Sequence, residues 1–165
     1  MLALVMSASG CSQAVPRLVP DVELWAAWPP TALSHGDTVR FWLFSPRVVA
    51  LGDSVPTRVE VENVAGRGWL ELSFAGRSPH IDLVVYDRAM HEIYRYSRGL
   101  EPLMNQDLRS LDVGERLVFP SVWDQRTGSA VRPGSPIAPG DYYLSAFVRF
   151  GNGEVELPTR TLTVQ

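Results

Sequence analysis

Short stretches that alternate apolar and polar residues are the feature that most constrains how this chain can fold. Residues 55–63 (VPTRVEVEN) and 69–74 (WLELSF) both alternate with a period of two. That period places successive side chains on opposite faces of a β-strand. The residues expected to face inward are Val55, Val59, Val61, Leu70, Leu72 and Phe74. Arg58, Glu60 and Glu62 are expected on the solvent face, so these segments predict half-buried antiparallel strands.

Turn-forming residues interrupt the apolar runs at short intervals. The 165 residues include 13 Gly and 13 Pro, and Gly151-Asn152-Gly153 is typical of a tight hairpin. No segment of useful length has a helical period. We therefore predict an all-β fold, an Ig-like antiparallel β-sandwich of about seven to nine strands.

Several segments allow more specific predictions. The run that begins at Val39 breaks at Ser45-Pro46 and predicts an edge strand with a kink. Pro120 also places residues 116–123 at a sheet edge. Residues 100–115 have a poor pattern and predict a helical turn and a long connection, and residues 124–140 predict a long Gly/Pro loop. Tyr142 follows a Pro-Gly turn, as the tyrosine corner of Ig-like sandwiches does.

The N-terminal residues differ in character from the rest of the chain. Residues 1–6 are apolar, residues 7–10 are small, and Cys11 is the single cysteine. This layout is typical of a secretory signal, and small residues directly before a cysteine resemble a bacterial lipoprotein signal, in which that cysteine is lipidated. We predict a signal over 1–11, a flexible N-terminal arm or tether over 12–37 and the sandwich over 38–165. The expected location is the cell envelope, through a lipid anchor on Cys11, or the cytoplasm if residues 1–11 do not act as a signal.

Charge and residue types narrow the range of functions. A net charge of −3 without a basic cluster argues against nucleic acid as a ligand, and against direct binding to anionic lipid. A Ser–His–Asp site could use His80 or His91 with Asp82 or Asp87, but no serine lies on a strand-to-helix elbow. His91 and Glu92 are neighbours, so on a strand they point to opposite faces and make a poor metal site. We predict a protein that is not an enzyme and has no cofactor, metal or catalytic residue.

Three stretches together resemble a known family. They are IDLVVYDRAMHEIYRYSRG, VGERLVFPSVWDQRTG and APGDYYLSAFV, and they are similar to the intracellular proteinase inhibitor family, the BsuPI domain. The matching positions are Asp82, Asp87, Glu92, Arg95, Ser97, Gly99, Gln106, Gly114, Glu115, Trp123, Asp124, Gln125, Gly128, Pro139, Gly140 and Tyr142. Tyr94 and Tyr96 stand where the family has Trp, and the family's Asp-Gly turn is DRAM here.

The resemblance implies a non-catalytic protein whose partner is another protein, namely a subtilisin-like serine protease that it inhibits. Aromatic and arginine side chains supply much of the binding energy at protein interfaces. The residues expected to bind the partner are Tyr94, Arg95, Tyr96, Trp123, Asp124 and Gln125. The alternative is a lipid-anchored, Ig-like structural or interaction module of the bacterial cell envelope without inhibitory activity.

The lipid anchor leads to a simple test. We expect Cys11→Ala to move the protein out of the membrane fraction, because no acyl chains can then be attached. Cell fractionation followed by immunoblotting measures this change, and Ser12→Ala is the matched control that should stay with the membrane. Membrane association of Cys11→Ala equal to that of the unaltered chain would contradict lipidation.

Overall fold

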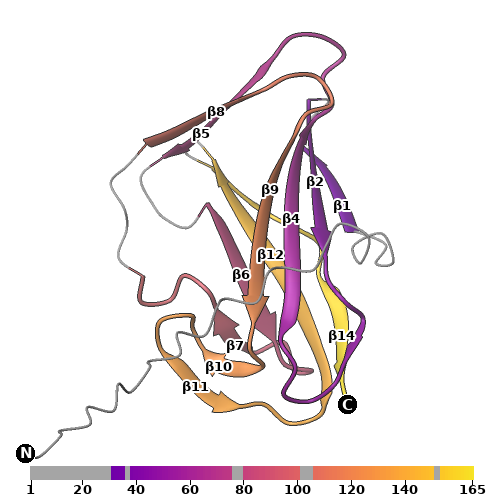
Figure 1. Cartoon of the computed structure of the whole chain (residues 1–165), viewed down its shortest axis with the longest axis vertical. Helices are drawn as coiled ribbons and strands as arrows, with labels where there is room; N and C mark the ends of the chain where they lie inside the picture. Colours follow the sequence, from indigo (N-terminus) through magenta and orange to yellow (C-terminus); the bar gives the residue numbers. More distant parts are fainter. Residues whose placement is uncertain (1–30, 36–37, 76–79, 101–105, 151–152) are drawn as a thin grey trace, which may run out of the picture.

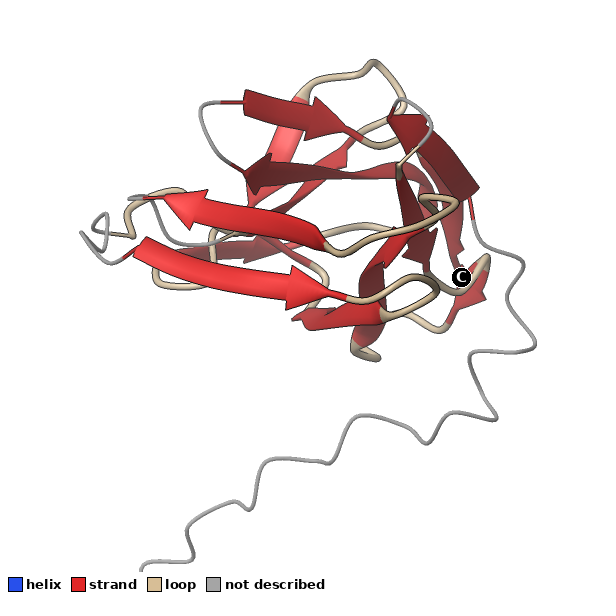
Figure 2. Cartoon of the chain, turned by 90° about the horizontal axis from the view of Figure 1, so that it is seen from above, coloured by secondary structure: helices blue, strands red, loops and turns tan. Residues whose placement is uncertain are grey.

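The chain folds as an all-β sandwich. A computed structural model describes residues 31–35, 38–75, 80–100, 106–150 and 153–165. In this part of the chain Figure 2 shows strands, loops and turns and no helix, and accordingly no helix that could cross a membrane. The prediction of an Ig-like, all-β sandwich is confirmed.

One layer is a four-stranded antiparallel sheet (Figure 1). Its strands, in spatial order, are β1 (Thr31–His35), β2 (Val39–Phe44), β4 (Val55–Asn63) and β9 (Arg116–Trp123). β9 is the edge strand that Pro120 predicts. β2 is not an edge strand, because β1 and β4 flank it. β1 lies inside the predicted arm, residues 12–37; the rest of the arm and Cys11 lie outside the described residues.

The opposite layer is a larger mixed sheet. Its strands, in spatial order, are β11 (Pro133–Pro136), β10 (Arg126–Gly128), β7 (Glu92–Arg95), β6 (Ile81–Tyr86), β12 (Gly140–Phe150), β14 (Arg160–Val164) and β3 (Val48–Val49). β13 (Gly153–Glu156) also pairs with β12, in the hairpin predicted around residues 151–153. Two pairs, β10 with β7 and β14 with β3, are parallel.

A third, two-stranded sheet lies at the upper end of the molecule (Figure 1). It pairs β5 (Leu70–Ala75) with β8 (Gln106–Leu111). β8 occupies part of residues 100–115, where a long connection was expected, while residues 101–105 lie outside the described part of the chain. β10 and β11 correct the expectation of a long loop in 124–140. The described residues contain fourteen strands, more than the seven to nine predicted, because several have only two to four residues.

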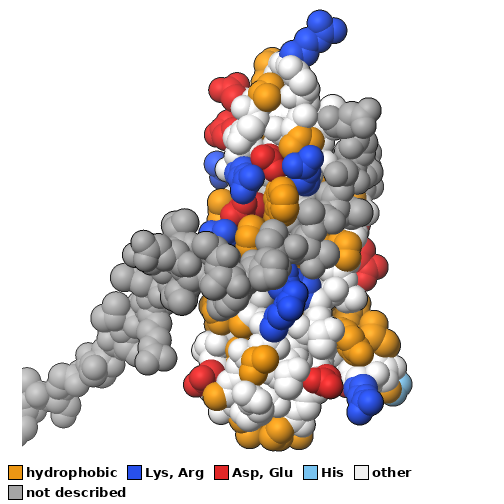
Figure 3. Space-filling view, turned by 90° about the vertical axis from the view of Figure 1, so that its right-hand side faces the viewer, with side chains coloured by type: hydrophobic (Ala, Val, Ile, Leu, Met, Phe, Trp, Pro, Cys, Tyr) orange, Lys and Arg blue, Asp and Glu red, His pale blue; other side chains and the backbone are white. Residues whose placement is uncertain are grey.

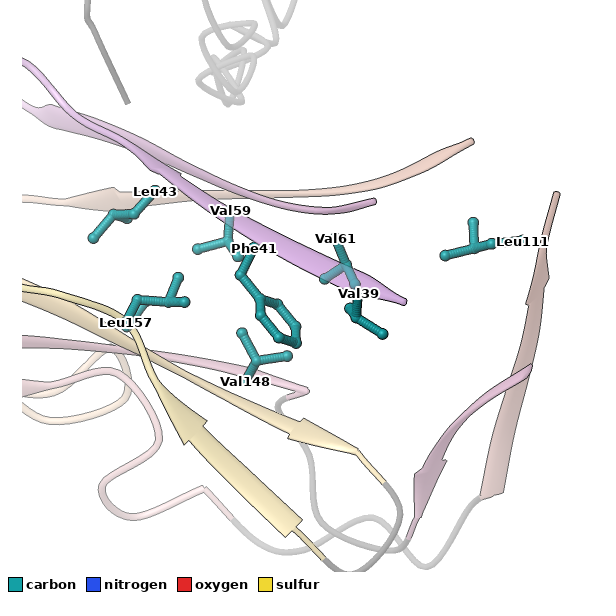
Figure 4. Packing of buried hydrophobic residues seen from close by; sticks show 9 residues of the cluster. Val39, Phe41, Leu43, Val59, Val61, Leu111, Val148 and Leu157 are labelled. Carbon is teal, nitrogen blue, oxygen red and sulfur yellow. The ribbon is translucent and has the colours of Figure 1, made fainter. Parts of the chain in front are cut away.

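The core fills the space between the two layers. In Figure 4 Phe41, Val59 and Val61 point from one sheet toward Val148 of the other and toward Leu157, which directly follows β13. This cluster also contains Val39, Leu43, Leu111 and Ala146. A second cluster, toward the lower end, is built around Trp123 and contains Leu83, Leu144 and Leu162. The two clusters run along the sandwich and position the loops at its ends.

The chain changes sheets at Ser45-Pro46, which explains the predicted kink. Arg160 of β14 is buried and donates from Nη1 to the Leu43 carbonyl (3.1 Å) and from Nη2 to the Ser45 carbonyl (3.3 Å). Burial lowers the pKa of Arg160. Its guanidinium thereby joins the two layers at the point where the strand β2 ends.

Glu60 corrects the expectation of a solvent-exposed face on β4. Glu60 is only 4% exposed, because two arginines enclose its carboxylate. Arg58 Nη2 lies 2.9 Å from Oε1, and Arg116 Nη1 of β9 lies 2.9 Å from Oε2. The ion pairs make this charged position part of the sheet's packing.

Candidate functional site

Half of the residues predicted to bind a protein partner are inside the domain. Trp123, Gln125 and Tyr94 are 0%, 2% and 5% exposed. Side chains so buried offer little contact area to a partner, which weighs against direct contact by these three. Arg95 and Tyr96 are half-buried, and Asp124 is exposed.

Trp123 is the centre of an aromatic group beneath the loops at the lower end. Its ring lies 6.1 Å from that of Tyr94 and 5.9 Å, edge-on, from that of Tyr142. Its indole Nε1 donates to the Arg126 carbonyl (2.8 Å), and the Tyr142 hydroxyl donates to the Ala138 carbonyl (2.6 Å). The second bond has the predicted geometry of a tyrosine corner. Burial raises the pKa of Tyr94 to about 12, so this phenol is neutral at physiological pH.

Asp82 is a buried carboxylate that holds the turn after β7. It accepts hydrogen bonds from the Ser97 amide (2.9 Å), the Ser97 hydroxyl (2.6 Å) and Arg95 Nη1 (2.9 Å). Arg149 Nη2 of β12 is 3.2 Å away. The two arginines neutralise a charge that burial would otherwise destabilise, so Asp82 and Arg95 serve the fold here.

Glu92 extends the same network to the surface. It accepts from Arg95 Nε (2.9 Å) and Nη2 (2.6 Å) and also pairs with Arg98. The hydrogen bonds from Arg95 lower the pKa of Glu92, and those from Glu92 raise the pKa of Arg95. Arg95 is thus held on both sides by acids of its own domain.

Asp87 orders the turn between β6 and β7. Its Oδ1 accepts from the amides of Ala89 (2.8 Å) and His91 (2.9 Å), and the bond from His91 lowers the pKa of Asp87. Met90, at φ 62°, is 52% exposed at the tip. His91 Nδ1 lies 3.3 Å from Asp87 Oδ2. This Asp–His pair, one of the combinations weighed for catalysis, belongs to the hydrogen bonding of a turn.

Gln125 orders a second turn, which lies between β3 and β4. Its Oε1 accepts from the Gly52 amide (2.9 Å), and its Nε2 donates to the Ala50 carbonyl (2.7 Å). Its own carbonyl accepts from the Ile137 amide (3.0 Å). Gln125 has a φ of 54°, in the left-handed region that side chains rarely adopt. One buried residue therefore connects three segments of the surface.

These segments meet at one end of the sandwich. β7 and β10 run parallel, with Gly128 opposite Tyr94, so the turn before β7 and the residues before β10 lie side by side. We name the surface segments here the lower loops: residues 50–54, 87–91, 124 and 137–140. Figure 3 shows hydrophobic side chains gathered at this lower end beside a few charged ones. Leu51 and Met90 are the large apolar residues that the lower loops expose.

A small pocket opens beside the lower loops. It has a volume of about 150 Å³, and its lining residues are Tyr94, Val122, Trp123, Asp124, Arg126, Ser129, Ala130 and Pro133. Tyr94 and Trp123 are buried, so the pocket reaches the aromatic group below the surface. Asp124 also accepts a long hydrogen bond from the Ser54 hydroxyl (3.4 Å). Among the described residues no cluster of three His, Cys, Asp or Glu side chains could hold a metal ion.

A family comparison decides the classification of this arrangement. The model of the BsuPI family, described as intracellular proteinase inhibitor, matches residues 42–153. The chain belongs to the BsuPI family. No curated protein matches the chain at a significant level.

Solved structures that resemble the chain share little sequence with it. The CARDB domain of the PF1109 protein from Pyrococcus furiosus has 18% identity and a TM-score of 0.42, covering 81% of this chain and 93% of that one. A β-glucosidase from Listeria innocua has 13% identity and a TM-score of 0.43, covering 76% of this chain and 16% of its own. The sporulation control protein Spo0M from Bacillus subtilis has 16% identity and a TM-score of 0.42, covering 78% of this chain and 49% of its own.

The residues by which this BsuPI domain resembles its family hold the loops in place. Asp82, Asp87, Gln125 and Tyr142 each bond to the backbone of a turn or loop. Gly128 has a φ of 92°, and a Cβ there would lie 2.4 Å from the Arg132 carbonyl oxygen, so a side chain does not fit. The signature specifies the scaffold beneath the lower loops.

Sequence reasoning missed Leu51 and Met90, the exposed apolar tips. Gly-Asp is typical of a turn, and an apolar residue directly before it is the signal that could have identified Leu51. Met90 lies inside the DRAM stretch, where this chain departs from the family's Asp-Gly turn. A departure confined to a loop tip is typical of a position that is free of packing constraints.

The Gln125 arrangement predicts a measurable loss of stability. We expect Gln125→Ala to lower the free energy of unfolding by about 1–3 kcal/mol, because two hydrogen bonds to the turn are lost. Alanine keeps the unfavourable φ, so the change reports the side chain alone. Urea denaturation followed by tryptophan fluorescence measures it. The exposed neighbour is the control, and Asp124→Ala should change stability by less than about 0.5 kcal/mol. Equal stabilities of the two variants would contradict this role of Gln125.

Proposed function

We propose that this BsuPI domain is a non-catalytic inhibitor of a subtilisin-like serine protease, and that it contacts the protease with the lower loops. The family supplies the general role of proteinase inhibitor. The observation that carries the proposal is that buried side chains hydrogen-bond to the backbone of exposed loops. The main example is Gln125, which bonds to Ala50 and Gly52.

Loops that are already ordered before binding suit an inhibitor for an energetic reason. Binding a partner costs free energy for every loop and side chain that becomes ordered on association. Protease–inhibitor complexes form with little backbone movement, and they are among the tightest complexes of their size. Turns that Gln125 and Asp87 have already ordered avoid much of that cost. The lower loops therefore favour a tight protein partner over a loosely held one.

The bonding of the acidic residues supports a non-catalytic role. A general base must be within hydrogen-bond reach of a substrate proton. Asp82 is buried and bonded to Ser97 and two arginines, and Asp87 bonds to two amides of its own turn. Both carboxylates of the combinations weighed for catalysis thus act on their own backbone and neighbours.

The location is part of the proposal. Lipidation of Cys11 would attach the domain to the cell envelope, where its partner would be a protease of the envelope or the medium. A partner inside the cell fits the family name equally well if residues 1–11 do not act as a signal. An interaction module without inhibitory activity is the outcome that the following experiment separates from inhibition.

The test is a titration of subtilisin with the purified full chain. Residual hydrolysis of a chromogenic peptide should fall linearly and reach zero near one chain per enzyme. Mass spectrometry of the same samples shows whether the chain stays intact. Trypsin, whose specificity pocket carries a carboxylate, is the control and should keep its activity. Full subtilisin activity in the presence of excess intact chain would contradict the proposed function.

A further inference from the structure

The turn Ala50–Asp53 identifies which side chain the protease would bind. We infer that Leu51 enters an apolar substrate pocket of the protease and is the anchor of the complex. This inference rests on the function proposed above and makes it specific. Leu51 is 49% exposed at the tip, and Gly52, Asp53 and Ser54 beside it are exposed as well.

Exposure alone would not distinguish Leu51, because single exposed apolar residues are common on protein surfaces. What distinguishes it is a backbone held from three directions. The Leu51 amide donates to the Gln165 carbonyl (2.8 Å) beside β14, and the Asp53 amide donates to the Ala50 carbonyl (3.2 Å) across the turn. The buried Gln125 side chain bonds to Gly52 and Ala50 from the interior of the domain. The apolar side chain is thus presented on an ordered base.

Exposed apolar residues on sheet surfaces lack this combination, and Val113, which is at another ordered turn, lies beside Asn63 at the other end of β4 from the lower loops. Leu108 and Val118 lie within the strands β8 and β9, where the side chain stands on a sheet surface and does not project from a tip. Met90 is at an ordered tip, but its unbranched side chain has more rotatable bonds and loses more rotamer freedom when held. Leu51 is the better anchor because a leucine side chain loses less entropy on binding.

A leucine anchor defines the chemistry of the partner. An apolar side chain transferred from water into an apolar pocket strengthens binding by about 10- to 100-fold. If the pocket carried a charged group, binding leucine would remove water from that charge without giving it a new partner, which is unfavourable. The protease should therefore be one that accepts apolar side chains, such as a subtilisin-type enzyme.

The same hydrogen bonds determine how the turn would lie in the protease. A substrate binds with an extended backbone, but Gly52 has a φ of 87° and bends the chain directly after Leu51. The amides of Leu51 and Gly52 already donate within the domain, so they are not available to pair with the protease. Leu51 would fill the pocket while the Leu51–Gly52 peptide bond stays away from the catalytic serine. Inhibition should accordingly proceed without cleavage at this bond.

The deciding experiment compares two leucine variants against subtilisin. Leu51→Ala should raise the inhibition constant by about 10- to 100-fold. Leu108→Ala removes the same atoms from a residue of similar exposure, 54%, at the opposite end of the molecule, and should leave the constant unchanged. Thermal unfolding of both variants should match that of the unaltered chain, because both side chains are exposed.

The outcomes separate this inference from the proposed function. If the unaltered chain inhibits and Leu51→Ala inhibits equally well, Leu51 is not the anchor although the inhibitor function stands. Cleavage between Leu51 and Gly52 during inhibition would also overturn the inference, because the turn would then bind as a substrate does. If the unaltered chain does not inhibit subtilisin, the proposed function and this inference both fail.

Discussion

The two hydrogen bonds between the Gln125 amide and the turn Ala50–Asp53 are the interaction on which the functional end of this domain depends. They cross from the segment that joins β9 and β10 to the segment that joins β3 and β4. Gln125 adopts an unfavourable left-handed backbone to make them, and such a conformation persists only where the surroundings hold it. The surroundings here include Ile137, whose amide bonds to the Gln125 carbonyl and whose side chain packs against the cluster of Trp123.

The residues that form the lower end of the domain fall into two groups, which differ in burial and in role. Buried polar residues such as Asp82 and Gln125 satisfy backbone groups of neighbouring loops, and Asp82 is also paired with two arginines. Such networks specify one arrangement, because leaving any member unpaired is costly. Leu51 and Met90 instead expose about half of their surface at the tips of the loops. The family signature falls in the first group, which is why it identifies the fold better than the target.

The sequence predicted what depends on local pattern. Alternation in residues 55–63 and the Pro-Gly turn before Tyr142 identified strands and a tyrosine corner that the structure confirms. Contacts between segments distant in sequence could not be predicted in this way. β8 pairs with a strand more than thirty residues earlier in the chain, and Glu60 is buried by an arginine 56 residues away. The same limit explains the site. Trp123 and Gln125 were expected to contact a partner because their residue types suit an interface, whereas a motif does not show which of its members face inward. The order at Leu51 likewise comes from a glutamine that is distant in sequence.

The central claim is that the turn at Leu51 is ordered before any partner binds. Amide hydrogen exchange of the free domain, measured residue by residue by NMR, tests it most directly. The amides of Leu51 and Gly52 donate to Gln165 and Gln125, so they should exchange at least about tenfold more slowly than unprotected amides of the same sequence. Exchange of both amides at the rate of an unstructured peptide would contradict the account, because the exposed leucine would then stand on a turn that the scaffold does not hold.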